Sequence, residues 1–236
     1  MSVELIRWDA PGPYDVVFST RRGGVSEGPF ASLNLGRKLG DVPERVDENR
    51  RRLCAETGAD LDRLALNYQR HTALVNRAEA GRRGATGDGL WTAEPELPIL
   101  ALGADCALVA LARTNGDRRA VGVLHAGRIG LLAGIVEAGV AAVGGRPAAA
   151  VGPTIGPCCY EVGEEIAAAY RARFGDDVVS GRKLDLWTSA ERALREAGCM
   201  SVERLDLCTA CDAERFFSYR RDGKPRGGHG VLARVA

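Results

Sequence analysis

This chain of 236 residues has few histidines, methionines and aromatic residues, and its charges nearly cancel. Thirty-two basic residues against 31 acidic ones leave a formal net charge of +1, so no overall field attracts the protein to nucleic acid or an acidic membrane. Its 30 glycines follow no period, which excludes collagen and repeat arrays. Hydrophobic residues make up 45% of the chain and occur along its whole length, which excludes a disordered protein. The composition is that of an ordinary globular protein.

The sequence shows no targeting segment. Residues 1–12 carry acidic and basic side chains where a signal peptide would have an apolar core. The longest apolar stretch, residues 120–145, is interrupted by His125, Arg128 and Glu137, whose charges would be costly in a bilayer. Seven cysteines are an odd number, and without an export signal we expect them to be reduced. We therefore expect a cytoplasmic protein that binds neither membranes nor nucleic acid.

The order of the expected strands and helices indicates the fold class. Apolar runs and alternation predict strands at residues 14–20, 64–75, 99–102, 107–112, 120–124, 216–220 and 231–235. Periodicity and end signals predict helices at residues 41–58, 129–143, 164–174 and 185–198. The first would open with a capping box at Asp41 and Glu44, and Asp185 would cap the last. Because strands and helices are intermixed without a long linker, we predict one α+β domain over residues 1–236, with mixed sheets flanked by helices.

Three residues are the main candidates for catalysis. His125 stands where an apolar strand meets a glycine-containing turn, and Cys106 stands at a comparable hinge. His71 lies in the expected strand at residues 64–75. Two imidazoles and a thiolate can bind a catalytic zinc ion with one position open, or can form a Cys/His nucleophilic pair. The alternative is a buried structural thiol with two hydrogen-bonded core histidines, because the spacing matches no ligand rule.

Four further cysteines occur as two pairs. Cys158 and Cys159 are adjacent, and Cys208 and Cys211 form a C-x-x-C string. They could make a four-cysteine zinc site or a redox pair. Adjacent cysteines suit a compact tetrahedral site poorly, and a single C-x-x-C string is common by chance. We therefore predict four reduced thiols that bind no metal.

Two glycine-rich loops are candidates for binding an anion. Arg21 follows an expected strand and precedes two glycines, so its guanidinium could hold a phosphate, although loop arginines are more often solvated. The loop at residues 152–157 precedes an expected helix and could bind phosphate through backbone N–H groups. It has neither a Walker lysine pattern nor a G-x-G-x-x-G string, so a simple turn is an equal alternative.

Six strings together resemble one known family. They are STRRGGVSEGPFASLNLG at 19–36, GADC at 103–106, HAG at 125–127, GPTIGPCCYEVG at 152–163, DLW at 185–187 and CTACDAERFFSYRRDG at 208–223. The chain thereby resembles the laccase-domain proteins, also called multicopper polyphenol oxidoreductases or the peptidoglycan editing factor family. The resemblance implies a single α/β/β/α domain related to cysteine-hydrolase-like toxin folds. It also implies a zinc or copper site formed by His71, Cys106 and His125.

The resemblance also implies several activities. Members are described as purine nucleoside enzymes that phosphorolyse adenosine, inosine and 5′-methylthioadenosine and deaminate adenosine. Others are described as polyphenol oxidases, and one branch as removing misincorporated serine from a cell-wall precursor. This chain departs from the family pattern at two positions: Arg128 stands where H-A-G-W-R-G has tryptophan, and Thr72 stands where glycine usually follows Q-x-H.

These observations lead to a ranked set of functions. The first is a purine nucleoside phosphorylase and adenosine deaminase that uses Zn²⁺, with Arg21 holding phosphate and Asp105 orienting a ligand histidine or protonating the leaving base. A copper oxidase is less favoured, because three histidines cannot build a multi-copper cluster and neither methionine lies in a ligand string. Cu²⁺ can still occupy the trio, since N/S sites generally bind copper more tightly than zinc. A Cys/His amidohydrolase, with Cys106 as nucleophile and His125 as base, and a catalytically silent binding module stay open.

Overall fold

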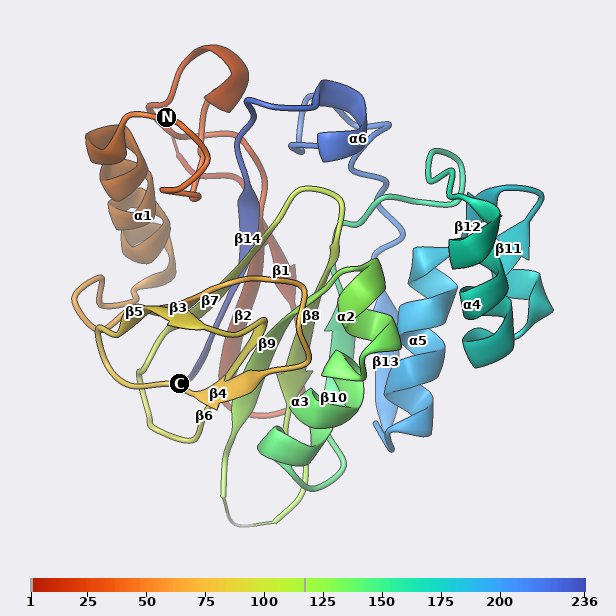
Figure 1. Ribbon diagram of the computed structural model, residues 1–236. Helices are drawn as coiled ribbons and strands as arrows, with labels where there is room; N and C mark the ends of the chain where they lie inside the picture. The colour runs from red at the N-terminus through yellow and green to blue at the C-terminus, as the bar shows by residue number, and fades with distance from the viewer. Residues whose placement is uncertain (1, 117) are drawn as a thin grey trace.

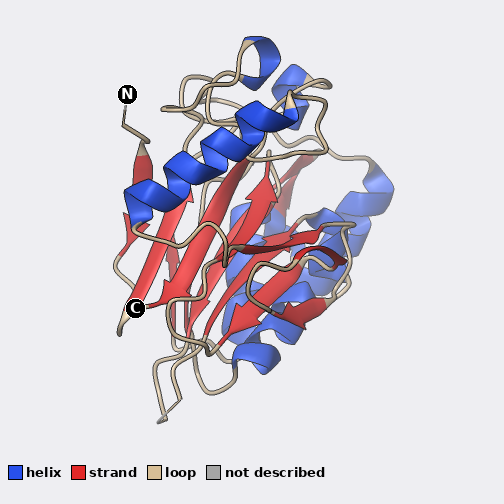
Figure 2. Cartoon of the chain, turned by 90° about the vertical axis from the view of Figure 1, so that its left-hand side faces the viewer, coloured by secondary structure: helices blue, strands red, loops and turns tan. Residues whose placement is uncertain are grey.

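The computed structural model describes residues 2–116 and 118–236. Two six-stranded sheets lie face to face, and helices cover both outer faces (Figure 1). Figure 2 shows helix α1 in front of one sheet and the other long helices behind the second. The layers are therefore α/β/β/α, and both sheets are mixed, so the predicted α+β class is confirmed.

The first sheet has the strand order β1-β2-β14-β7-β3-β5. The strands are β1 (Leu5–Trp8), β2 (Tyr14–Ser19), β14 (His229–Val235), β7 (Ile99–Gly103), β3 (Ala65–Tyr68) and β5 (Arg83–Thr86). The strands from β1 to β7 pair antiparallel, whereas β3 pairs parallel with β7 and with β5. Helix α1 (Pro43–Thr57) covers its outer face.

The second sheet has the order β13-β10-β8-β9-β6-β4. The strands are β13 (Ser201–Arg204), β10 (Ala148–Val151), β8 (Ala107–Ala112), β9 (Val121–Ala126), β6 (Gly89–Thr92) and β4 (Val75–Arg77). Its helices are α2 (Arg128–Leu132), α3 (Ile135–Val143), α4 (Glu164–Phe174) and α5 (Leu186–Glu196). The remaining elements are the hairpin β11 (Val179–Ser180) and β12 (Lys183–Leu184), helix α6 (Tyr219–Asp222), and the short turns η1 (Gly28–Phe30) and η2 (Asp176–Val178).

Strand β8 shows why one run of the sequence is apolar without interruption. Leu108 and Ala110 face the core between the two sheets, while Val109 and Leu111 face the core under the helices. Successive side chains of a strand point to opposite faces, so a strand covered on both sides has no position for a polar residue. The first residue of β8, which directly follows Cys106, is thereby buried inside the molecule.

The expected strand at residues 64–75 is wrong. Strand β3 ends at Tyr68 in the first sheet and β4 begins at Val75 in the second, so His71 lies in the connection between sheets. Gln69 ends the pairing: its side-chain amide donates to the Leu102 carbonyl at 2.6 Å and accepts the Leu102 N–H at 2.9 Å. A side chain therefore replaces the backbone ladder, and the chain turns across to the other sheet.

Three other expected elements also differ. The helix at 129–143 is two helices, because Gly134 adopts φ 88° between α2 and α3. The capping box is absent, since α1 begins after Val42 and no side chain caps it. The strand at 216–220 is instead a loop and helix α6, where the Ser218 hydroxyl accepts the N–H of Arg221. For the divided helix and the missing strand, a local turn overrides the apolar pattern.

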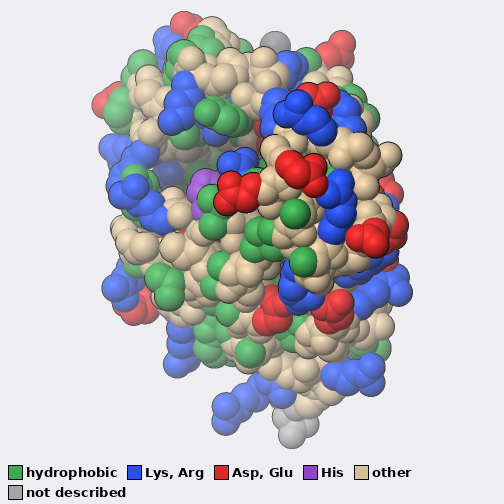
Figure 3. Space-filling model, turned by 45° about the vertical axis from the view of Figure 1, so that its right-hand side comes forward, with side chains coloured by type: hydrophobic (Ala, Val, Ile, Leu, Met, Phe, Trp, Pro, Cys, Tyr) green, Lys and Arg blue, Asp and Glu red, His purple; other side chains and the backbone are tan. Residues whose placement is uncertain are grey.

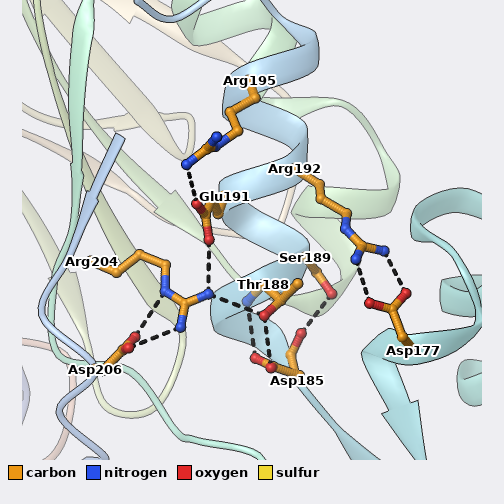
Figure 4. A network of polar contacts seen from close by, with 9 residues as sticks. All are labelled: Asp177, Asp185, Thr188, Ser189, Glu191, Arg192, Arg195, Arg204 and Asp206. Atoms are coloured by element: carbon orange, nitrogen blue, oxygen red, sulfur yellow. Dashed lines mark hydrogen bonds and ion pairs between the residues drawn. The ribbon is translucent and has the colours of Figure 1, made fainter. Parts of the chain in front are cut away.

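Helix α5 begins where its sequence predicts. The Asp185 carboxylate accepts the Thr188 N–H at 2.9 Å and its hydroxyl at 2.8 Å (Figure 4). Arg204, at the end of β13, joins this helix by pairing with Glu191 at 2.8 Å. Within the described residues, no helix has the length and apolarity needed to cross a membrane.

Candidate metal and active site

The structure brings His71, Cys106 and His125 together. His71 lies between β3 and β4, Cys106 lies between β7 and β8, and His125 lies on β9. Antiparallel pairing sets Leu108 opposite His125, so the chain entering β8 meets the end of β9. One ligand atom from each residue lies within 4.8 Å of the others. The Cys106 sulfur is 3.8 Å from His71 Nε2, and the two imidazole rings meet edge to face with centroids 4.9 Å apart.

Asp88 holds both histidines. Its Oδ1 lies 2.9 Å from His125 Nδ1, which leaves Nε2 as the ring nitrogen free for a metal or a proton. The same carboxylate accepts the backbone N–H groups of Arg70, His71 and Thr72 at 3.1, 2.9 and 2.7 Å. The Thr72 hydroxyl donates to it at 2.8 Å. Sequence reasoning missed Asp88, whose only signal is a lone acidic residue between two glycines before an apolar strand.

Charges around this group shift three pKa values. Desolvation raises the pKa of the Cys106 thiol, but the charge and hydrogen bond of His125 and the hydrogen bond of His71 outweigh it and lower the pKa to about 6. Burial lowers the pKa of His125, but the Cys106 thiolate and the Asp88 carboxylate outweigh it and raise the pKa to about 9. Burial raises the pKa of Asp88, yet its hydrogen bonds hold it well below its usual range. Both shifts favour a thiolate on Cys106 and an imidazolium on His125, and a thiolate is the form of cysteine that binds a cation or attacks carbon.

Gly127 gives the group its space. A Cβ at this position would lie 2.8 Å from the Cys106 sulfur and 3.0 Å from His71 Cδ2, so only glycine fits between β9 and α2. His71 itself adopts φ 62°, and Asp105 adopts φ 103°. Both conformations are costly for residues with a side chain and require support from the surrounding structure. His229 lies elsewhere, buried against Phe216 with ring centroids 5.5 Å apart.

Asp105, expected to orient a ligand histidine or to protonate the leaving base, makes no hydrogen bond to His71 or His125 within the described residues. Its carboxylate accepts the Thr209 hydroxyl and the Arg220 backbone N–H, each at 2.6 Å. Asp88 takes the histidine-orienting position instead, because β6 lies beside β9 in the sheet. Arg21 is largely engaged: Nε donates to the Ala31 carbonyl at 2.6 Å and Nη1 to another carbonyl at 3.0 Å. These contacts, which sequence reasoning did not foresee, occupy the Asp105 carboxylate and two of the five side-chain N–H groups of Arg21.

Two arginines that the expected site does not include lie within electrostatic reach of Cys106. The Arg226 guanidinium stacks on Tyr219 at 4.7 Å, and its buried Nε has no hydrogen-bond partner among the described residues. Burial lowers the pKa of Arg226, against the opposing charges of Asp105 and Cys106. Arg128 donates to the Tyr160 hydroxyl at 3.4 Å. In Figure 3 a histidine side chain lies at a hollow, with lysine or arginine side chains and an acidic side chain around it. The arrangement suits an anion beside the ligand group.

The four remaining candidate cysteines also come together. The sulfurs of Cys158, Cys159, Cys208 and Cys211 all lie within 4.8 Å of one another, although adjacent cysteines were expected to suit a compact site poorly. The first pair lies in a tight turn, where the Cys159 N–H donates to Gly156. A turn, unlike a strand, allows neighbouring side chains to reach the same point.

Comparison with known proteins gives consistent results. Residues 15–235 match the family described as multi-copper polyphenol oxidoreductase laccase. A Pseudomonas aeruginosa relative named purine nucleoside phosphorylase is 35% identical over 228 residues, covering 92% of each chain. A Deinococcus radiodurans relative of the same name is 41% identical over 222 residues, covering 89% of this chain and 85% of its own.

Solved structures share the whole architecture. A Neisseria meningitidis protein superposes with a TM-score of 0.87 at 29% identity, covering 100% of this chain and 99% of its own. YlmD from Geobacillus stearothermophilus superposes with a TM-score of 0.85 at 27% identity, covering 97% and 94%. The overall fold is therefore common to all three proteins.

Proposed function

Because the chain belongs to the multi-copper polyphenol oxidoreductase laccase family, whose relatives are named purine nucleoside phosphorylases, we propose that it phosphorolyses purine nucleosides at the His71, Cys106 and His125 group. Adenosine, inosine and 5′-methylthioadenosine would each react with phosphate to give the free base and ribose 1-phosphate or its methylthio derivative. Adenosine deamination at C6 is part of the same proposal. The observation that carries it is an N₂S ligand group within electrostatic reach of Arg226, whose buried Nε has no hydrogen-bond partner among the described residues.

The three residues fit a metal ion. In a tetrahedral site with Zn–N bonds of about 2.0–2.1 Å and a Zn–S bond of about 2.3 Å, the ligand atoms stand about 3.3–3.6 Å apart. The observed separations of at most 4.8 Å reach these values if the side chains approach one another by up to about 1.5 Å. Asp88 supplies the carboxylate that a zinc-bound histidine usually has on its other nitrogen. His71, Cys106 and His125 would hold the ion, and a bound zinc ion would supply Lewis acidity.

The remaining roles belong to the chain's own groups. Arg226, and Arg21 through its remaining N–H groups, would hold the phosphate that replaces the base. Arg128, kept in place by Tyr160, would add positive charge at the Cys106 side. Asp105 would act as a positioning residue, because it fixes the backbone of Arg220 next to the ligand cysteine.

The test is product identification with adenosine and phosphate. We expect adenine and ribose 1-phosphate, with the rate lost after chelation and restored by Zn²⁺. Copper in place of zinc would appear in elemental analysis, since copper binds such a site more tightly. For Arg226→Ala we expect the KM for phosphate to rise about 10-fold or more, with little change for the nucleoside. Arg195→Ala, on the exposed side of α5, is the matched control. Absence of base release at any metal loading contradicts the proposal.

A thiol hydrolase is the second candidate, and a specific geometry favours it. Cys106, the two histidines and Asp88 are arranged as nucleophile, base and orienting acid. The thiolate would attack an amide carbon, the C–N bond would break, and a histidine would give its proton to the departing amine. Water would then cleave the resulting thioester, which releases the acid and restores the thiol. Addition of zinc would inhibit such an enzyme, whereas chelation would activate it. Cys106→Ser separates the two: a ligand loses metal and turnover together, and a nucleophile loses turnover only.

A further inference from the structure

A second group of metal-ligating side chains lies outside the site described above. Cys158 and Cys159 belong to the loop between β10 and α4, and Cys208 and Cys211 to the loop after β13. The Cys211 sulfur lies 3.5 Å from that of Cys158 and 3.4 Å from that of Cys159. Four sulfurs around one zinc ion at about 2.3 Å stand about 3.8 Å apart, which is close to these separations. We propose that these four cysteines bind a second, structural zinc ion.

The surroundings of the sulfurs suit thiolates bound to a cation. The Gly156 N–H donates to the Cys208 sulfur at 3.3 Å, and an amide donor of this kind stabilises a negative sulfur. Four thiolates at these distances would repel one another strongly without a cation between them. Cys158 and Cys211 are exposed, so an ion can enter from solvent.

The two loops are joined before any ion binds. Thr154 donates its N–H to the Leu207 carbonyl at 3.0 Å, and Thr209 donates its N–H back to Thr154 at 3.3 Å. Arg204 pairs with Asp206 at 2.9 Å and with Glu191 on α5, which fixes the chain just before Cys208 (Figure 4). The ligands are thus pre-positioned, which lowers the entropy lost when metal binds.

A disulfide explains the group less well. The Cys211 sulfur is almost equally far from those of Cys158 and Cys159, so no single partner is selected. Any one disulfide would leave two of the four thiols without a role. One tetrahedral ion uses all four, as in closed structural zinc sites.

The site would support the residues next to Cys106. Ile155, in the first loop, donates its N–H to the Asp105 carbonyl at 2.9 Å. Thr209, in the second loop, donates its hydroxyl to the Asp105 carboxylate at 2.6 Å. A zinc ion that joins both loops would therefore fix Asp105 from two sides and stabilise its left-handed backbone.

The test measures metal per chain in protein purified under reducing conditions with added zinc. We expect about two zinc ions per chain in the wild type and about one in the Cys158→Ser/Cys211→Ser double variant. Cys106→Ser should instead lose the other ion and keep the four-sulfur one. Cobalt loaded into Cys106→Ser protein should give the intense visible absorption of tetrahedral thiolate ligation, and X-ray absorption of the zinc form should show four sulfur neighbours. Cys199→Ser, which changes a buried cysteine outside the group, is the matched control.

Two results would overturn the inference. One is a wild type that binds a single zinc ion, lost in Cys106→Ser and unaffected in the double variant. The other is a metal-free group whose mass shows a disulfide among these four cysteines. If the double variant does not fold, the cobalt and X-ray spectra of Cys106→Ser protein still decide. Cys106→Ser protein lacks the cysteine of the proposed active site. If its four other cysteines bind no metal, the zinc inference fails and the phosphorylase proposal is unaffected.

Discussion

At the scale of single residues, Asp88 organises the candidate site. Its carboxylate is buried and accepts three backbone N–H groups, one hydroxyl and one imidazole. Thr72, which departs from the family pattern, supplies two of these contacts. The hydroxyl adds a bond that glycine at this position would lack. The departure therefore strengthens the support that Asp88 gives to His71 and His125.

Thr72→Ala tests this support. The variant keeps the backbone N–H but loses the hydroxyl that lies 2.8 Å from Asp88 Oδ2. We expect the zinc affinity of the His71, Cys106 and His125 group to fall about 10-fold, as for other groups that orient metal ligands indirectly. Competition with a chelator measures the affinity. Thr72→Ser restores the hydroxyl and should match the wild type, and equal affinities for all three proteins would contradict the role.

At the scale of elements, the junction between β9 and α2 determines the spacing of the ligand side chains. Gly127 is the N-cap residue of α2, with extended backbone angles that any residue adopts. The requirement for glycine is therefore one of space, set by the Cys106 sulfur and the His71 ring. The short helix α2 then ends with Ala133 as its C-cap, and the left-handed backbone of Gly134 lets α3 start in a new direction.

Gly127→Ala should separate metal binding from folding. Its Cβ would displace the Cys106 sulfur and the His71 ring, so we expect metal content and turnover to fall at least about 10-fold while circular dichroism stays unchanged. Gly163→Ala is the matched control, because Gly163 caps α4 with similar angles and has no atom within 4 Å of its Cβ position. Similar losses in both variants would mean that helix capping, not space at the ligands, causes the effect.

Asp185→Ala tests the start of α5. The variant removes both side-chain contacts to Thr188 and should lower the free energy of unfolding by about 1 kcal/mol. Urea unfolding measures the change. Asp185→Asn keeps an acceptor for the Thr188 N–H, so its free energy of unfolding should fall clearly less than that of Asp185→Ala. If alanine and asparagine cost the same, the cap contributes through its charge alone.

At the scale of the whole molecule, three apolar layers determine which groups ionise. Cys54 is buried in the layer between α1 and the first sheet, and Cys199 in the layer under the helices of the second. Burial raises the pKa of each thiol to about 11. The pKa of a thiol in the unfolded state is about two units lower. Between about pH 9 and pH 11 the unfolded state therefore holds fewer protons than the folded state. The free energy of unfolding must fall across this range.

The Cys54→Ala/Cys199→Ala variant measures this contribution. Between about pH 9 and pH 11, the free energy of unfolding should fall less in this variant than in the wild type. The difference between the two decreases should be on the order of 2 kcal/mol per thiol. Urea unfolding at several pH values gives the slope, and the slope is independent of any cavity that the substitutions create. If the free energy of unfolding varied with pH in the same way in both proteins, the buried thiols would ionise as readily as free ones.

Local chemistry in the sequence was sufficient for part of this structure. The apolar run at 107–112 and the helix at 164–174 appear with the predicted bounds, and Asp185 caps α5 as predicted. Each depends on contacts between residues near one another in the chain, or on burial of both faces of one strand. The resemblance to a family and the scarcity of histidine also singled out His71, Cys106 and His125, which the structure gathers.

Only the tertiary structure decided the rest, because the deciding contacts join distant segments. The chain leaves the first sheet after Tyr68 because a side chain 33 residues from Leu102 takes over the backbone pairing. Asp88 reaches His125 across 37 residues because β6 and β9 are neighbours in the second sheet. The cysteine pairs at 158–159 and 208–211 meet only because β10 and β13 lie side by side. Sequence alone determined which groups are chemically capable, and the sheet order determined which of them act together.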